Sequence, residues 1–214
     1  MPPKQKFAKK DVLKAAFQLV REQGIENLNA RNIAKMLNSS TQPVFSHYKN
    51  MDDLKADLFT MVSEHNNSYF FKINLSDASL TGKNLLVNIG MAYIDFALDE
   101  PNLFRLMFLS RNFTGKTLSD FFSFFDHYEY EEPYTPLEKA INELYDIDSP
   151  ETMRMFIDIW LYAHGIASML ALNQLPTPRS EIEAMLKNMY DMIAEKNKKI
   201  RKKINHGGTR RKKG

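Results

Sequence analysis

Apolar residues recur at intervals of three and four along most of this 214-residue chain, and this spacing limits the possible folds more than any other feature. The stripe that stops at Gly24 shows it well and consists of Val12, Leu13, Ala16, Phe17, Leu19 and Val20. Side chains three and four apart share one side of an α-helix, whereas a strand alternates its faces every second residue. Few segments alternate in that way. We therefore expect an all-α protein.

The composition is that of a folded protein without disulfide bonds. Apolar residues make up 43% of the chain and aromatic residues 12%, which is too much for a disordered chain. The length suits one large domain or two small ones and is enough to bury a core. No run of 18 uncharged apolar residues exists, the first residues lack the apolar stretch of a signal peptide, and cysteine is absent. We expect a soluble, cytoplasmic protein.

Charge is separated along the chain, although the net charge is only +3. Residues 1–50 hold nine Lys or Arg and three Asp or Glu, a balance of +6, whereas residues 51–195 hold ten against 23, a balance of −13. Residues 196–214 hold ten basic residues and no acidic ones. Three interpretations of this basic end stay open: a solvated tail, non-specific phosphate binding, or contact with the acidic middle.

The first fifty residues have the parts of a helix-turn-helix. A helix ending at Gly24 is followed by a short helix with Asn29 as its N-cap, a turn at 38–40 and a second short helix at 41–48. Asn50 then caps a longer helix. A helix-turn-helix places its second helix in the major groove of DNA, and the positive charge of this segment favours contact with phosphates.

We divide the chain into four parts: a helix-turn-helix domain at 1–50, a connecting helix at 51–72, a regulatory and dimerisation domain at 73–200, and a basic tail without ordered structure at 201–214. Further helices are expected at roughly 82–99 and 101–110, from Thr135, from Ser149 to about Gln174, and from the capping box at Ser180. Ten Phe or Tyr residues lie between Phe104 and Tyr134.

The N-terminal segment is similar to a known family. The strings that carry the resemblance are Val12-Leu13-Lys14-Ala15-Ala16, Glu22-Gln23-Gly24, Asn29-Ala30-Arg31-Asn32-Ile33-Ala34, Val44-Phe45-Ser46-His47-Tyr48-Lys49 and Asp52-Asp53-Leu54. In register and without a gap, they resemble the DNA-binding domain of the TetR family of bacterial transcriptional regulators. Two positions depart from the family pattern: Phe45 stands where Tyr is usual, and Met51 where Lys is usual. In the family both usual residues contact phosphate, so Lys49 or Lys55 is the candidate to contact phosphate in their place.

The recognition helix implied by this resemblance spans residues 41–48. Gln42 suits bidentate readout of adenine, and Pro43 offers apolar contact to a thymine methyl. Phe45 and Tyr48 are expected to pack the small core, whereas His47 suits either a contact to the DNA backbone or a core position. The candidate DNA-binding residues are Arg31, Ser40, Thr41, Gln42, Pro43, Ser46, His47, Lys49 and Lys55. Of these, Arg31 and Lys49 are expected to clamp phosphates, and Ser40 is also a turn or N-cap candidate.

The later part of the chain resembles one subdivision of TetR C-terminal domains, which is named for a Trp-His-Gly motif. The strings are Ala92-Tyr93-Ile94-Asp95-Phe96-Ala97, Pro101-Asn102-Leu103-Phe104-Arg105-Leu106-Met107-Phe108 and Trp160-Leu161-Tyr162-Ala163-His164-Gly165-Ile166-Ala167. The aromatic residues suit either a filled core or a pocket for a small apolar or aromatic ligand. His164 suits either a packing corner with Trp160 or a ligand contact. The candidate pocket residues are Phe104, Phe108, Phe121, Phe125, Trp160 and His164.

The last two predicted helices, at about 150–174 and 180–200, each carry a long apolar side. TetR-like proteins pair the corresponding helices across a two-fold axis, so the resemblance implies a homodimer. The candidate dimerisation residues are Ile157, Leu161, Ile182, Met185, Leu186, Met189 and Ile193. A dimer with recognition helices ~34–36 Å apart suits a near-palindromic operator in double-stranded DNA.

The functional prediction is a sequence-specific DNA-binding transcriptional regulator, which the resemblance implies to be a repressor released from its operator by a small molecule. The alternative is a DNA-binding architectural or cell-cycle factor of the same fold without an inducer. The sequence has no Ser-His-Asp or Cys-His motif, no Gly-rich phosphate loop and no H-x-x-x-H spacing, so we expect neither an enzyme nor a metal site or cofactor.

Overall fold

A computed structural model describes residues 7–73, 82–109, 150–174 and 176–207. All regular elements within these ranges are helical, which confirms the all-α prediction there. The elements are α1 (Lys9–Gln23), the 3-10 turn η1 (Ile25–Asn27), α2 (Ala30–Met36), α3 (Gln42–His47), α4 (Met51–Phe70), α5 (Gly82–Asp99), α6 (Pro101–Phe104), the π-helical η2 (Arg105–Leu109), α9 (Pro150–Ala171) and α10 (Arg179–Gly207). None of the described helices is long and apolar enough to cross a membrane.

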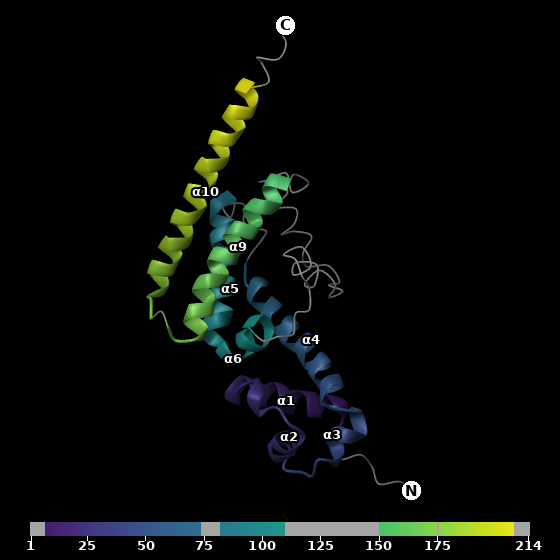
Figure 1. Ribbon diagram of the computed structural model, residues 1–214. Coiled ribbons are helices and arrows are strands. Elements are labelled where there is room, and N and C mark those ends of the chain that lie inside the picture. The colour runs from purple at the N-terminus through teal and green to yellow at the C-terminus, as the bar shows by residue number, and fades with distance from the viewer. Residues whose placement is uncertain (1–6, 74–81, 110–149, 175, 208–214) are drawn as a thin grey trace.

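The three N-terminal helices form a small head at one end of the molecule, and α4 leads from it into the body (Figure 1). Val12 and Ala16 of α1, Ile33 of α2 and Val44 of α3 are completely buried against one another and against α4. Local signals set the helix limits as the sequence predicted. The Asn29 side chain accepts a hydrogen bond from the backbone N–H of Asn32 at 2.9 Å, which satisfies one free donor at the start of α2.

Local signals also start α4 and end α1. The Asn50 side chain accepts two backbone hydrogen bonds, from Asp52 and Asp53, both at 2.9 Å. Gly24 follows α1 with a φ of +83°, a conformation that costs glycine less than other residues. These signals lie within a few residues of the boundary that they define, so the sequence alone located them.

The body is built around α5, which lies beside α4, α9 and α10 (Figure 1). Ion pairs between Arg179 and Asp95 and between Lys83 and Asp191, at 2.8 and 2.5 Å, set α10 antiparallel to α5. Between them the Tyr190 hydroxyl donates to the Leu86 carbonyl oxygen at 2.7 Å. The helices α5 and α10 are therefore closely matched over about three turns.

The C-terminal helix differs from its prediction at both ends. It begins at Arg179, one residue before the predicted cap at Ser180, and it continues to Gly207. Residues 201–207, which were placed in the basic tail, therefore continue α10 as helix. Neither Pro nor Gly interrupts the sequence between Arg179 and Gly207, and Lys and Arg are good helix formers. Residues 208–214, and the helix predicted from Thr135, lie outside the described residues.

Candidate nucleic-acid interface and its link to the body

The helix α3 is attached to the head by one side and exposes the other. Val44 is fully buried and Tyr48, four residues later, is 4% exposed, so these two side chains anchor the helix in the core of the head. Gln42 and Ser46 lie on the exposed side. In Figure 1, α2 and α3 lie at the end of the molecule opposite to the far ends of α9 and α10. An exposed short helix on a rigid support is the geometry that DNA readout requires.

Phe45 is the exception to the predictions for α3. The sequence predicts it in the core, but 55% of its surface is exposed. The reason is geometric, because a helix of six residues has one side against the core and Val44 and Tyr48 occupy it. Phe45 is rotated by about 100° from Val44, given 3.6 residues per turn. The sequence showed an aromatic residue but did not show on which side of so short a helix it lies.

The polar residues of α3 are partly engaged within the head. The Ser46 hydroxyl donates to the Pro43 carbonyl oxygen at 2.9 Å, which leaves its oxygen able to accept. The His47 ring contacts the Phe7 carbonyl oxygen through Nε2 at 2.9 Å, and since a carbonyl only accepts, Nε2 carries the proton. His47 therefore holds the segment that precedes α1. Thr41 precedes the first turn of α3 without a side-chain capping bond, and Ser40 Oγ is 3.4 Å from the Gln42 nitrogen.

The predicted phosphate-binding residues fall into two groups. Arg31 and Lys49 are exposed, and neither has an ion pair with another described residue. Lys55, in contrast, pairs with Asp52 one turn earlier at 2.9 Å. Lys9, which the sequence did not single out, pairs with Asp57 at 2.6 Å and lies over the Tyr48 ring. Arg31 and Lys49 are thus the predicted cations that are available to DNA without breaking an ion pair.

A buried carboxylate joins the head to the body. Glu100, directly before α6, is 3% exposed and accepts two hydrogen bonds from the Arg21 guanidinium, at 2.6 and 2.7 Å. Its Oε1 also lies 3.1 Å from Nε2 of His65. Hydrogen bonding to Glu100, and then its charge, raise the pKa of Arg21. Three separate elements, α1, α4 and the start of α6, therefore meet at one carboxylate.

Two further contacts reinforce this joint. The Asn102 side-chain amide donates to the Arg21 carbonyl oxygen at 3.0 Å, and Arg105 pairs with Glu26 at 3.3 Å. The joint could not be predicted from the sequence, because Arg21 and Glu100 are 79 positions apart and each resembles an ordinary surface charge. The weak signal was Glu100 itself, a carboxylate placed directly before Pro101 between two apolar helices.

The predicted ligand-pocket residues that the structure describes form a packed corner. His164 stacks on Trp160 at 4.7 Å between ring centroids, and its Nδ1 lies 2.8 Å from the Tyr93 hydroxyl. Its Nε2 lies 3.3 Å from the Ser168 hydroxyl. Burial lowers the pKa of His164, so the neutral imidazole is favoured, with one nitrogen donating and the other accepting.

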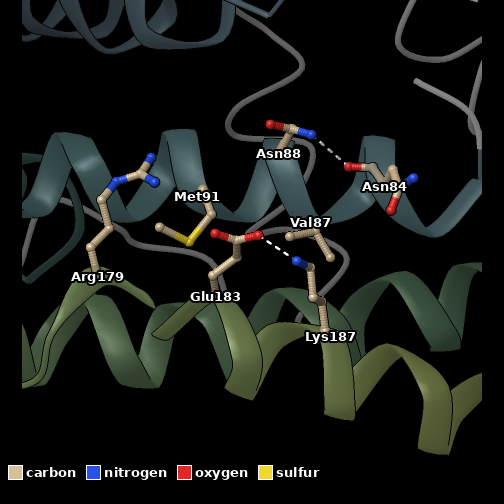
Figure 2. A pocket seen from close by; sticks show the side chains of 7 residues that line it. All are labelled: Asn84, Val87, Asn88, Met91, Arg179, Glu183 and Lys187. Atoms are coloured by element: carbon tan, nitrogen blue, oxygen red, sulfur yellow. Dashed lines mark hydrogen bonds and ion pairs between the residues drawn. The ribbon is translucent and has the colours of Figure 1, made fainter. Parts of the chain in front are cut away.

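Phenylalanine rings complete this corner. Phe104 is completely buried and lies 5.9 Å from the His164 ring, while Phe108 is partly buried. Phe121 and Phe125 lie outside the described residues. A cavity of about 310 Å³ lies elsewhere, between α5 and α10. Figure 2 shows its lining, which is mostly polar and includes the Lys187–Glu183 ion pair, rather than the predicted aromatic lining; the residues are Asn84, Val87, Asn88, Met91, Arg179, Glu183 and Lys187.

The predicted dimerisation residues divide between the inside and the outside of the subunit. Ile182, Leu186 and Met189 are buried within the subunit, so their assignment to a dimer contact is wrong. They belong to the core against α5, where Leu186 Cδ1 would lie only 3.0 Å from a Cβ placed on Gly90. Ile157, Met185 and Ile193 are half-buried and Leu161 is 44% exposed.

An exposed apolar stripe remains on α9. Leu161 and Met169 are each more than 40% exposed and, with Gly165 between them, are spaced by four residues along one side of the helix. Leu172, directly after the last residue of α9, is 45% exposed. A Cβ on Gly165 would meet nothing within 4 Å, so this point of the surface is open. On α10, Met192 is 63% exposed. A single subunit thus leaves apolar area of both helices in contact with water.

A helix-turn-helix head joined to a body whose described elements are all helical is the architecture of a class of DNA-binding regulators. Residues 86–193 match the family described as "Tetracyclin repressor-like, C-terminal domain". This match spans half of the chain, and the chain belongs to the TetR-like family of transcriptional regulators. The Trp-His-Gly subdivision stays a prediction.

Solved structures agree with the fold. A TetR-like transcriptional regulator from Rhodococcus sp. RHA1 is similar with a TM-score of 0.57 and 12% identity, over 85% of this chain and 92% of the other. A second TetR transcriptional regulator from the same organism has a TM-score of 0.54 and 12% identity, over 87% of this chain and 97% of the other. No curated protein sequence matches the chain.

Proposed function

We propose that this protein is a homodimeric transcriptional repressor that binds a near-palindromic DNA operator through α3 and leaves it when a small ligand binds the body. The observation that carries the proposal is the exposed side of α3 on a core-anchored helix-turn-helix, in a chain that belongs to this family. The available cations Arg31 and Lys49 flank that surface in sequence.

On this proposal, the exposed side chains of α3 divide the work of recognition. Gln42 reads an adenine through paired hydrogen bonds, and Ser46 and Thr41 accept or donate at neighbouring base edges. Pro43 and the exposed Phe45 present apolar area to thymine methyl groups. Arg31 and Lys49 bind phosphates and set the register without reading sequence.

The dimer is supported by the apolar stripe on α9 together with Met192 on α10. A second copy would cover these residues, and Gly165 would let the two α9 helices approach closely. A homodimer also gives the two-fold symmetry that a near-palindromic operator requires. Of the predicted contact residues, Ile157, Leu161, Met185 and Ile193 remain in the proposal.

Release of the operator by a ligand requires a physical connection between the body and the DNA-binding head. The contacts at Glu100 are the candidate for this connection. Glu100 holds Arg21 of α1 and His65 of α4 at once, so a shift of α6 moves both helices of the head–body joint. An unidentified small apolar or aromatic molecule that binds near Trp160, Phe108 and His164 would favour the shifted arrangement. Ligand and operator would then oppose each other by the same coupling free energy.

Selection of binding sites from random double-stranded DNA tests the proposal with the full chain. The expected result is a near-palindrome whose half-sites are one helical turn, ~34–36 Å, or a multiple of it, apart. Light scattering at micromolar concentration should give twice the 24.9 kDa mass of one chain. Recovery of random sequences, or a monomer in solution, would contradict the proposal.

A second candidate is an architectural or cell-cycle DNA-binding factor without an inducer. The packing of His164 between Trp160, Phe104 and Tyr93 favours it, because a filled corner offers a ligand little room. A thermal-shift screen of apolar and aromatic compounds separates the two candidates. A compound that raises the melting temperature and weakens DNA binding supports the ligand-released repressor, whereas no response across the screen supports the second candidate.

A further inference from the structure

The C-terminal helix runs away from the DNA-binding head. Its first residue, Arg179, pairs with Asp95 near the end of α5 that leads to Glu100 and the head. Asp191 pairs with Lys83 at the opposite end of α5. From Arg179 to Gly207 the helix is about 42 Å long at 1.5 Å per residue. Its C-terminal end therefore lies far from α3, as Figure 1 shows for the yellow end of α10.

The final part of α10 projects beyond the other described helices of the body. Ile193 still packs against the core, and residues 194–207 continue the helix for about 21 Å at 1.5 Å per residue. In Figure 1 this part extends past the ends of α5 and α9. Because α5 begins at Gly82, opposite Asp191, it does not accompany this projection.

The sequence of this projection is strongly basic. Residues 196–207 include six Lys or Arg and no Asp or Glu, so positive charges recur about every 3 Å along the helix axis at 1.5 Å per residue. Four more basic residues follow at 210–213. Ile200 and Ile204 continue the helical series of Ile182, Leu186 and Ile193. Four basic positions, 198, 199, 201 and 202, fall on the other sides of the helix, whereas Lys196 and Lys203 are four and three residues from Ile200 and lie beside this series. Such a density suits a polymer that carries one negative charge per ~1.7 Å, as double-stranded DNA does.

We propose that residues 196–207 of α10 form a second, sequence-independent binding site for double-stranded DNA. Since the helix points away from the head, the bound duplex is a different segment from the one at α3, and the protein links two segments of DNA. A membrane surface is the less suitable partner, because a membrane-surface helix needs an apolar face richer than two isoleucines. The second site does not depend on operator reading, whereas the linking of two segments rests on the proposed function.

The test replaces five basic residues of the projection with glutamine: Lys198, Lys199, Arg201, Lys202 and Lys203. Glutamine has a helix propensity close to that of Lys and Arg, so α10 should stay folded, which circular dichroism checks. A 30-base-pair duplex of random sequence is attached to beads, and capture of a second, fluorescent duplex is measured. The wild-type chain should capture the second duplex. The five-substitution variant should retain at least tenfold less of the second duplex while it still binds the first.

Salt dependence gives an independent readout on the same duplex. The logarithm of the binding constant falls with the logarithm of salt by ~0.9 per phosphate contact, so five lost contacts reduce the slope by up to about 4.5. The matched control, Arg31→Gln with Lys49→Gln, changes the head instead. It should weaken binding to a selected operator and leave in place the binding of a single random duplex that depends on α10.

Several outcomes would overturn this inference. Equal capture and an equal salt slope for the five-substitution variant would show that the projection does not hold DNA. Binding of the wild type, but not of the variant, to vesicles with 30% phosphatidylserine, without an effect on DNA capture, would assign the site to a membrane. Failure of operator selection with intact capture would instead remove the proposed function and leave the second site standing.

Discussion

Removal of Arg21 should destabilise the protein more than neutralisation of its partner Glu100. Glu100 is 3% exposed and accepts two hydrogen bonds from Arg21, so Arg21→Ala leaves a buried carboxylate whose remaining side-chain contact is the His65 ring. Breaking a buried pair in this way costs ~3–5 kcal/mol. Arg21 itself has a 45% exposed side chain, so water screens part of the interaction and we expect roughly 2–3 kcal/mol.

Glu100→Gln removes the charge but keeps an oxygen that can accept from Arg21. The guanidinium that loses its partner is half exposed and is hydrated, so the expected cost is only about 1 kcal/mol. In the double variant the side chain at position 100 is an uncharged amide and no longer needs Arg21. The double variant should therefore be more stable than Arg21→Ala alone, which gives a non-additive cycle of at least ~1 kcal/mol.

Urea unfolding at pH 7.5 measures the wild type, the two single variants, the double variant and a control at one protein concentration, because the stability of a dimer depends on that concentration. Arg105→Ala is the matched control, since its pair with Glu26 is exposed on both sides and should contribute less than ~0.5 kcal/mol. The reasoning is refuted if Arg21→Ala costs no more than Arg105→Ala, or if Glu100→Gln is the more destabilising substitution.

Three further predictions concern DNA binding, assembly and pH. Phe45→Tyr restores a hydroxyl at an exposed position of α3, and a hydrogen bond to phosphate worth ~1.5 kcal/mol should raise operator affinity about tenfold in a mobility-shift titration; unchanged affinity would place the ring away from phosphate. Met192→Lys, at a 63% exposed apolar site, should weaken the dimer in light scattering and leave the monomer folded, and an unaltered dimer would exclude that part of α10 from the interface. Burial lowers the pKa of His164, so near pH 6.5 the unfolded chain binds a proton that the folded protein does not bind, and stability falls as the pH falls. Between pH 7.5 and 5.5, His164→Asn should lose less unfolding free energy than the wild type, by at most ~1.4 kcal/mol per pH unit. Tyr93→Phe, which keeps the imidazole, should lose as much as the wild type.

The sequence located features whose causes are local. Asn29 and Asn50 cap the helices that they precede, and Gly24 ends α1, because each of these contacts spans only a few residues. Periodicity also found the apolar side of α10. It did not show what covers that side, so Ile182 and Leu186 were assigned to a partner subunit although α5 covers them.

The features that were missed depend on tertiary structure. The side of α3 on which Phe45 lies follows from how so short a helix attaches to the head. The contact between Arg21 and Glu100 joins residues 79 positions apart, and neither residue differs in sequence context from a surface charge. The basic C-terminal end was visible as a charge run, but its position far from the head follows from the antiparallel packing of α10 on α5.

The central claim is that α3 reads the sequence of an operator, and one comparison of base preferences tests it. The affinities of the wild type and of Gln42→Ala are measured for the selected operator and for every single-base substitution in one half-site. The account predicts that the variant loses ~1–3 kcal/mol of discrimination at one base pair and keeps its preferences elsewhere. A uniform loss of affinity at all positions, or an unchanged preference profile, would contradict the claim.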